Sequence, residues 1–420
     1  MYENLLAQPA SNLLVQDIRT DKLPPSILFS GESASGKLTA ALETARILSC
    51  LAGSAEWTCP CASCQKHRLL IHPDLLLAGP KDCLPEIRAA SQAFLRNGQA
   101  ASRFLFIRSV RKLVLRFDPA MYEGDETRYA RSISSLGSIA EDLEDFELLT
   151  AGSAETAVVE KKVASIVNEA EKLETGTMYE AVPVSMIRKI ASWSHLAPYG
   201  KKKIVIIERA DRMQDSARNA FLKILEEPPR DVVFILTTSR RGAILPTILS
   251  RVRTYGFISR PMDVQQSVIT RVFHDTPLEN ETLDQYFSRF LPVPPEKIRE
   301  TAAGFVQLVL REAQTAGRIP PESIQSVLAG EQTGDRSETI TDLVASLNKC
   351  KPDSIWRRFL VSVTAIFSRA LREQTLSPRD SRIYAEWNSG LREALLVVDT
   401  YNLSPVAALE KLSVEMRNAL

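Results

Sequence analysis

Short runs of apolar residues predict the strands of a buried sheet. Residues 26–30, 203–207 and 232–236 are each largely apolar. Strands that read as continuous apolar runs, rather than alternating with polar residues, are typical of a parallel sheet that helices cover on both faces. The pattern therefore predicts an α/β core.

Helical patterns surround these strands. Residues 10–21 read as an amphipathic helix, and residues 39–51 repeat apolar side chains at helical spacing directly after the first strand. Strand, glycine-containing loop and helix thus follow one another. After Phe257 the strands stop, and everything to Leu420 reads as helices separated by turns.

A long helical insert is predicted between about residues 84 and 180. Apolar side chains recur there at alternating steps of four and three, at Val159, Val163, Ile166, Ala170 and Leu173. Such spacing indicates helices that bury one stripe against each other. We expect an inserted hairpin or bundle.

Charge is unevenly distributed in this insert. Residues 86–117 carry seven basic side chains against the single acid Glu86, whereas residues 141–147 are mostly acidic. Helices of opposite sign could simply pair. The basic segment 103–116 could instead contact DNA phosphates, or form an ordinary solvated helix face.

The bulk composition is that of a globular protein. A chain of 420 residues is too long for one ordinary core, so two or three domains are expected. Its 52 basic and 51 acidic side chains nearly cancel, and this balance demands neither nucleic acid nor membrane as a partner. Without an apolar run of 18 residues or a signal peptide, the sequence predicts a cytoplasmic protein without membrane partners.

The segment Gly31–Lys37 matches the phosphate-binding pattern G-x-x-x-x-G-K. Glycines such as Gly31 and Gly36 let backbone amides, including that of Ser35, turn towards phosphate oxygens, and Lys37 adds a positive charge. The strand before and the helix after favour phosphate binding, of ATP or ADP, over a purely structural turn.

The residues around this loop favour binding over hydrolysis. Magnesium normally takes a Ser or Thr hydroxyl immediately after the lysine, but Leu38 stands there and Thr39 follows one step late. Glu208 follows the strand 203–207 at the place of a metal-binding acid, and Arg209 replaces the carboxylate that would orient water. Alternatively, residues 208–211 only open the next helix.

Four cysteines predict a zinc site. Cys50, Cys59, Cys61 and Cys64 offer four soft ligands within a short stretch, as a closed tetrahedral site needs. Because a single residue separates Cys59 from Cys61, His67 or His72 could replace one thiolate. Four buried thiols without metal are the alternative.

Several segments together resemble the clamp-loader AAA+ family of bacterial DNA polymerase III. The entry from Lys22 to Lys37, the cysteine knuckle and His72-Pro-Asp74 contribute to the likeness. Residues 219–229 (NAFLKILEEPP) resemble the family's Leu-Glu-Glu-Pro-Pro signature more specifically. Residues 245–251 (LPTILSR) resemble its serine-arginine-cysteine motif, with Val252 in place of the cysteine.

The resemblance implies specific roles. Arg251 would be an arginine finger that reaches the ATP of a neighbouring subunit, although a surface ion pair is the alternative. If residues 303–307 correspond to the lid motif with the sensor arginine, Gln307 stands in its place. With Leu38 and Arg209, these departures bring the chain closer to the delta-prime stator than to the gamma/tau motor.

We therefore expect an AAA+ P-loop core over residues 1–257, with a zinc knuckle at 50–74 and the insert at about 84–180. An α-helical lid at 258–330 and an α-helical collar domain at 331–420 would follow. The family implies gamma/tau and delta subunits, a sliding clamp and primed DNA as partners, with weak or absent intrinsic ATPase activity. A slow gamma/tau-like motor, and a DNA-binding scaffold acting through the insert, are the two alternatives.

Overall fold

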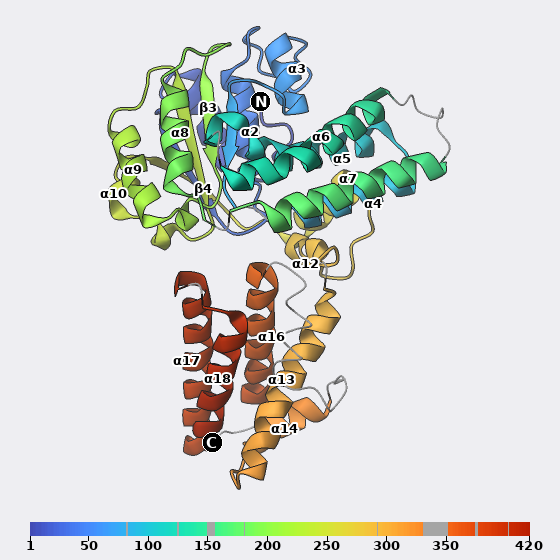
Figure 1. Ribbon diagram of the computed structural model, residues 1–420, viewed down its shortest axis with the longest axis vertical. Helices are drawn as coiled ribbons and strands as arrows, with labels where there is room; N and C mark the ends of the chain where they lie inside the picture. Colours follow the sequence, from blue (N-terminus) through green and yellow to red (C-terminus); the bar gives the residue numbers. More distant parts are fainter. Residues whose placement is uncertain are drawn as a thin grey trace. The chain divides into compact units, whose positions relative to one another are not determined.

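The computed structural model describes residues 1–80, 83–123, 126–148, 156–179, 181–291, 293–330, 352–373, 377–401 and 403–420. The chain divides into two compact units, Met1–Phe290 and Leu291–Leu420 (Figure 1). The finer division into core, lid and collar stays a prediction. Residues 331–351 of the predicted collar lie outside the described residues.

The first unit is built on a parallel sheet, as predicted. Its five strands lie in the order β2-β3-β4-β1-β5 and every neighbouring pair is parallel. The strands are β1 (Ser26–Gly31), β2 (Leu75–Ala78), β3 (Lys203–Ile207), β4 (Val232–Thr238) and β5 (Arg253–Phe257). The two edge strands, β2 and β5, were not predicted, because β2 is very short and β5 mixes polar and apolar residues.

Helices cover both faces of this sheet (Figure 1). On one face, Ile27 and Phe29 of β1 pack in one core with α1 (Ala10–Arg19), α2 (Lys37–Leu48) and the segment that holds the cysteines. Leu28, which points to the opposite face, belongs to a second core. Alternate side chains of one strand thus enter different cores, which explains why the strands are apolar throughout.

The second core contains the insert. Its helices are α4 (Leu84–Asn97), α5 (Ala100–Val114), α6 (Thr127–Leu148) and α7 (Thr156–Gly176), and they pack with α8 (Val184–Ser194) and α9 (Asp215–Glu226). The predicted apolar stripe of α7 is confirmed, with Ile166 and Ala170 fully buried. The insert therefore shares its core with α8 and α9, which pack on this face of the sheet.

Oppositely charged side chains join helices of the insert, as predicted for its basic and acidic segments. Arg111 of α5 forms an ion pair with Glu147 of α6 at 2.7 Å, and Arg88 of α4 pairs with Glu171 of α7 at 2.9 Å. These contacts join helices that are far apart in the sequence.

Shorter elements complete the first unit. They are α3 (Ala62–Leu69), α10 (Pro246–Leu249), α11 (Met262–Val272), α12 (Leu283–Ser288) and the 3-10 turns Leu115–Phe117, Pro119–Met121, Ala210–Arg212 and Arg241–Ala243. Phe273 and Tyr286, from the α11–α12 region, pack against Ala89 of α4.

The second unit is helical throughout its described residues, as predicted. It contains α13 (Pro295–Thr315), α14 (Glu322–Ala329), α16 (Pro352–Glu373), α17 (Pro378–Tyr401) and α18 (Pro405–Asn418). Several of these helices begin with proline, whose fixed φ suits the first helical position. Phe305, Phe359 and Trp387 are fully buried in its core.

Among the helices described, none combines the length and the apolar character that crossing a bilayer requires.

Candidate functional site

The predicted phosphate loop lies at the carboxyl edge of the sheet, where parallel α/β folds bind ligands. Gly31–Lys37 joins β1 to α2. Gly79 and Glu208 follow the neighbouring ends of β2 and β3, since Ala78 pairs with Ile207. Thr238 ends β4 beside Ser30 of β1. The fold thus brings four separate segments to one edge.

Gly36 has the conformation that the loop needs. It caps α2 with φ of 93°, in the left-handed region that disfavours other residues, and no side chain caps the helix start. A Cβ at this position would lie 2.5 Å from Arg260 Nη2. Among the described residues, no side chain caps the amides at the start of α2, which suits a helix start that binds an anion.

The Lys37 ammonium group folds back over the loop. It donates to the carbonyl oxygens of Gly31, at 2.7 Å, and Glu32, and to Ser35 Oγ at 3.2 Å. Burial lowers the pKa of Lys37 to about 8, although the carboxylates of Glu208 and Asp211 act in the opposite direction. Lys37 therefore lies within the electrostatic reach of both acids.

The position after the lysine is apolar in structure as well as in sequence. Leu38 is buried in the same core as Leu5 and Leu42. Thr39 follows it on α2 and is only partly buried. The loop therefore offers no hydroxyl at the place from which magnesium normally takes one.

Glu208 is engaged by an arginine from the insert. Arg116 Nη2 lies 2.5 Å from Glu208 Oε2, and Arg116 Nη1 donates to the Gly79 carbonyl oxygen at 2.9 Å. Both side chains are buried, at 2% and 11% exposure. No sequence pattern indicated this pair, because 92 positions separate the two residues.

The second acid near the loop, Asp211, is also engaged. Its carboxylate accepts a hydrogen bond from Thr238 Oγ1 at 2.7 Å and forms an ion pair with Arg240 at 3.1 Å. Asp211 lies in a 3-10 turn, and α9 begins only at Asp215. The alternative that residues 208–211 open the next helix thus applies in part to Asp211, which lies in the first turn of this 3-10 helix, but not to Glu208, whose carboxylate pairs with Arg116.

Arg260, which sequence reasoning missed, contacts the loop directly. It lies three residues after β5, and its guanidinium donates to the carbonyl oxygens of Ala34 at 2.9 Å and Leu6 at 3.3 Å. Burial lowers the pKa of Arg260. Its position after β5 would have been the only signal, and that strand was not predicted.

The four predicted cysteines converge after α2. The sulfur atoms of Cys50, Cys59, Cys61 and Cys64 all lie within 4.8 Å of one another. Cys50 and Cys59 are 3.8 Å apart, which matches the separation of about 3.8 Å between thiolates that share a tetrahedral zinc at 2.3 Å. The donor set therefore fits a closed zinc site.

The surroundings of Cys61 favour deprotonation of its thiol. Burial alone would raise the pKa of Cys61, but backbone amides, that of Cys64 first among them, donate to its sulfur and lower the pKa to about 6. A metal-binding thiol must be deprotonated, so this environment assists binding.

Neither histidine belongs to the cysteine cluster within the described residues. His72 is held by Ser63 Oγ at 3.1 Å and by the amide of Asp74 at 3.1 Å. His67 stacks on His72 with ring centroids 4.1 Å apart. The geometry favours four thiolate ligands over a set that includes histidine.

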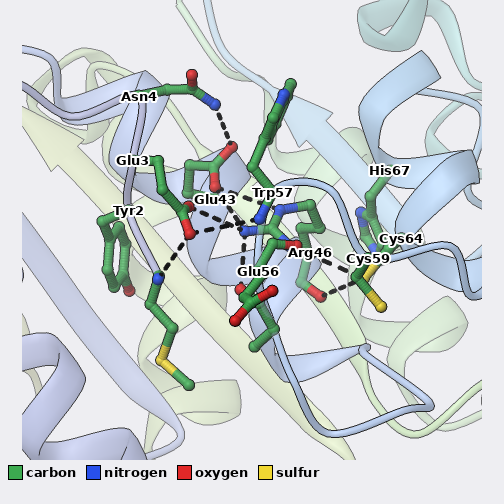
Figure 2. A network of polar contacts seen from close by, with 12 residues as sticks. Tyr2, Glu3, Asn4, Glu43, Arg46, Glu56, Trp57, Cys59, Cys64 and His67 are labelled. Carbon is green, nitrogen blue, oxygen red and sulfur yellow. Dashed lines mark hydrogen bonds and ion pairs between the residues drawn. The ribbon is translucent and has the colours of Figure 1, made fainter.

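Arg46 anchors the cysteine segment to α2 (Figure 2). Its guanidinium pairs with Glu43 at 2.9 Å, donates to the Glu56 carbonyl oxygen at 2.6 Å and lies 3.8 Å from Cys64 Sγ. The guanidinium also lies 5.5 Å from the Trp57 ring centroid. This buried network fixes the loop that carries Cys59.

The predicted arginine finger contacts α9 and α10. Arg251 follows α10 and pairs with Glu226 of the Leu-Glu-Glu-Pro-Pro segment at 2.7 Å. Its side chain is 34% exposed. The surface ion pair that was the alternative is thus present, but exposed pairs of this kind contribute little free energy, so Arg251 can exchange partners.

Gln307 lies on α13 in the second unit. Its amide donates to the Leu328 carbonyl oxygen of the same unit at 3.5 Å. The suggestion that it replaces a sensor arginine stays a prediction.

Comparison with known proteins identifies relatives for much of the first unit. A family model described as "DNA polymerase III, delta subunit" matches residues 7–178 and 166–260. Together these ranges cover more than half of the chain.

Individual relatives carry related names. The chain is 26% identical over 254 residues to DNA polymerase III subunit delta' of Bacillus subtilis, covering 60% of this chain and 48% of that protein. It is 36% identical over 80 residues to subunit delta' of Pseudomonas aeruginosa, covering 19% and 24%. It is 31% identical over 86 residues to subunit gamma/tau of Mycobacterium bovis, covering 20% and 15%. The matches thus span less than half the length of each of these relatives.

A crystal structure of a DNA polymerase III gamma subunit-related protein from Thermotoga maritima aligns over 97% of this chain and 98% of its own. Its sequence identity of 18% and TM-score of 0.35 are too low to carry an argument.

Proposed function

This chain belongs to the DNA polymerase III delta-subunit family, and we propose that it is a delta-prime-like stator of the clamp loader in DNA replication. In this role it assembles with gamma/tau and delta subunits and helps to load the sliding clamp onto primed DNA. Its first unit is then an AAA+ core with a zinc knuckle.

The engagement of both acids beside the phosphate loop is the observation that carries this proposal. Glu208 pairs with Arg116, and Asp211 pairs with Arg240. A hydrolytic site needs carboxylates to hold a metal ion and to orient water. The loop is therefore proposed to hold a nucleotide with little or no turnover of its own.

The catalytic contribution is proposed to lie at Arg251. A guanidinium that reaches a neighbour's ATP offsets the charge that develops during phosphoryl transfer. The exposure of Arg251 and its weak pairing with Glu226 support such a role.

The test is Arg251→Ala in the reconstituted complex. We expect ATP turnover of the complex to fall by about tenfold or more, since arginine fingers contribute large factors to turnover. The free energy of unfolding of the subunit should change by less than about 1 kcal/mol, because an exposed ion pair is lost.

Glu226→Gln is the matched control. It removes the same ion pair but keeps the guanidinium, so complex turnover should stay at the level of the unmodified protein. Unchanged turnover with Arg251→Ala would contradict the role in trans. Clamp- or DNA-stimulated ATPase activity of the isolated chain would contradict the stator itself.

The two alternatives have less support. A slow motor would need Glu208 and Thr39 to serve a metal ion, and Lys37→Ala would then abolish intrinsic turnover. A DNA-binding insert would need exposed basic residues, whereas Arg108 and Arg111 donate to the Arg68 and Leu69 carbonyl oxygens at the end of α3. Deleting the insert would abolish salt-dependent DNA affinity only in that second case.

A further inference from the structure

We propose that the Gly31–Lys37 loop binds a nucleoside diphosphate without a divalent metal ion, because Arg116 of the insert holds the carboxylate that the metal would need. The inference rests on the proposed function only in taking the loop as a phosphate site. It adds a role for the insert, which the family resemblance does not explain.

The Arg116–Glu208 pair is difficult to displace. The two side chains are buried and 2.5 Å apart, and the second Arg116 nitrogen donates to Gly79 at 2.9 Å. An arginine stays protonated in proteins, so a metal ion that took Glu208 would leave a buried cation without its carboxylate. Arg116 therefore keeps Glu208 from a metal ion.

The other groups around the loop do not complete a magnesium site. Magnesium requires oxygen ligands in near-octahedral geometry. Leu38 provides no oxygen, and Asp211 is held by Thr238 and Arg240. The side chains present thus do not fit the ion that usually accompanies a nucleotide at such a loop.

Two other cations are available to offset phosphate charge. Lys37 contacts only carbonyl oxygens and a hydroxyl, and Arg260 contacts only carbonyl oxygens, so neither forms an ion pair with a carboxylate in the described part of the chain. Both lie against the loop, since Lys37 donates to the Gly31 carbonyl oxygen and Arg260 donates to the Ala34 carbonyl oxygen. A guanidinium and an ammonium together suit a diphosphate.

Calorimetric titration of the full chain with ADP, in EDTA and in excess magnesium chloride, tests this inference. We expect the two dissociation constants to agree within about threefold. Affinity that is about tenfold or more tighter with magnesium would overturn the proposal. Absence of ADP binding under both conditions would overturn it as well.

Arg116→Met tests the role of the insert. It removes the guanidinium that pairs with Glu208, so magnesium should now strengthen ADP binding by about tenfold. Arg111→Met is the matched control, since Arg111 belongs to the same helical segment but pairs with Glu147, and its ADP affinity should stay metal-independent. Metal-independent binding by a folded Arg116→Met variant would remove the role assigned to Arg116. The titration of the unmodified chain decides the main point even where this variant fails to fold.

Arg260→Gln tests the second cation. ADP affinity should fall by about tenfold in EDTA, as expected for the loss of a charged hydrogen-bond donor. An unchanged affinity would contradict the role of Arg260. The stator role is measured separately, by ATP turnover of the reconstituted complex, and can hold even where ADP does not bind.

Discussion

Lys37 shows how burial changes the chemistry of a motif residue. Its ammonium group is surrounded by loop carbonyl oxygens, and burial lowers its pKa from 10.5 to about 8. Below pH 8 the folded and unfolded chains both carry the proton, so the cost of burying the charge is fully expressed. Between pH 8 and 10.5 the unfolded chain binds more protons, and this residue's contribution to stability rises with pH.

We predict that ADP binding weakens as the pH rises above about 8. Lys37 is then largely neutral, and a proton must bind to it together with ADP. The association constant should fall by at most about tenfold per pH unit. Titration at pH 7, 8 and 9 measures this fall.

Lys37→Arg is the control for this prediction, since its guanidinium does not titrate in that range. An equally steep fall in this variant would show that another group is responsible.

Functional residues could be predicted where the members of a site lie close together in the sequence. The loop Gly31–Lys37, Leu38 and the four cysteines each lie within a short stretch, and the structure brings each group together. The partners of Glu208 and Asp211 were not predictable in this way. Arg116 reaches Glu208 only because the insert packs on the sheet, and no spacing rule connects residues across such a contact.

At the scale of elements, a small number of hydrogen bonds hold the cysteine knuckle in place. Its helix α3 has only eight residues, and such short helices are marginal without tertiary contacts. Arg108 and Arg111 of the insert donate to carbonyl oxygens at the end of α3, where positive charge stabilises a helix. The Arg46 network holds the loop before α3, and a metal ion bound by the four cysteines would add a further constraint.

We therefore predict that the purified chain contains about one zinc ion and that its removal loosens the knuckle. Amide protons of residues 59–69 should exchange faster after treatment with a chelator, while those of β1, β3 and β4 keep their protection. Hydrogen exchange followed by mass spectrometry measures both regions. Cys64→Ser should reproduce the effect, and a zinc content near zero in the unmodified chain would reject the site.

The elements themselves were largely predictable from periodicity. The stripe Val163, Ile166, Ala170 and Leu173 is buried as its spacing indicates. Periodicity could not show which surface each apolar stripe packs against. It therefore left open that α4 to α7 share a core with α8 and α9, and that arginines of the insert contact the end of α3 and Glu208.

At the scale of the whole molecule, the two compact units have separate cores. Phe221 lies in a core confined to the first unit, and Trp387 lies in a core confined to the second. Both side chains are almost fully buried, and the indole of Trp387 donates to the Met416 carbonyl oxygen at 2.9 Å. Units with independent cores can unfold independently.

We predict two unfolding transitions in urea. Trp387→Ala should destabilise the transition of the second unit by about 3–5 kcal/mol, as large core truncations do, and leave the first unchanged. Phe221→Ala is the matched counterpart for the first unit. Fluorescence and circular dichroism follow the transitions, and a single transition that both substitutions shift equally would contradict independent units.

The start and the end of the insert are tied together by one carboxylate. Glu174, near the end of α7, accepts hydrogen bonds from the amides of Cys83, at 2.8 Å, and Leu84, at 3.0 Å, where α4 begins. The insert thus begins and ends at one place. A segment of this kind can be gained, lost or exchanged during evolution without rerouting a strand. Arg116 lies within this segment, so a relative that lacked the segment would also lack this partner of Glu208.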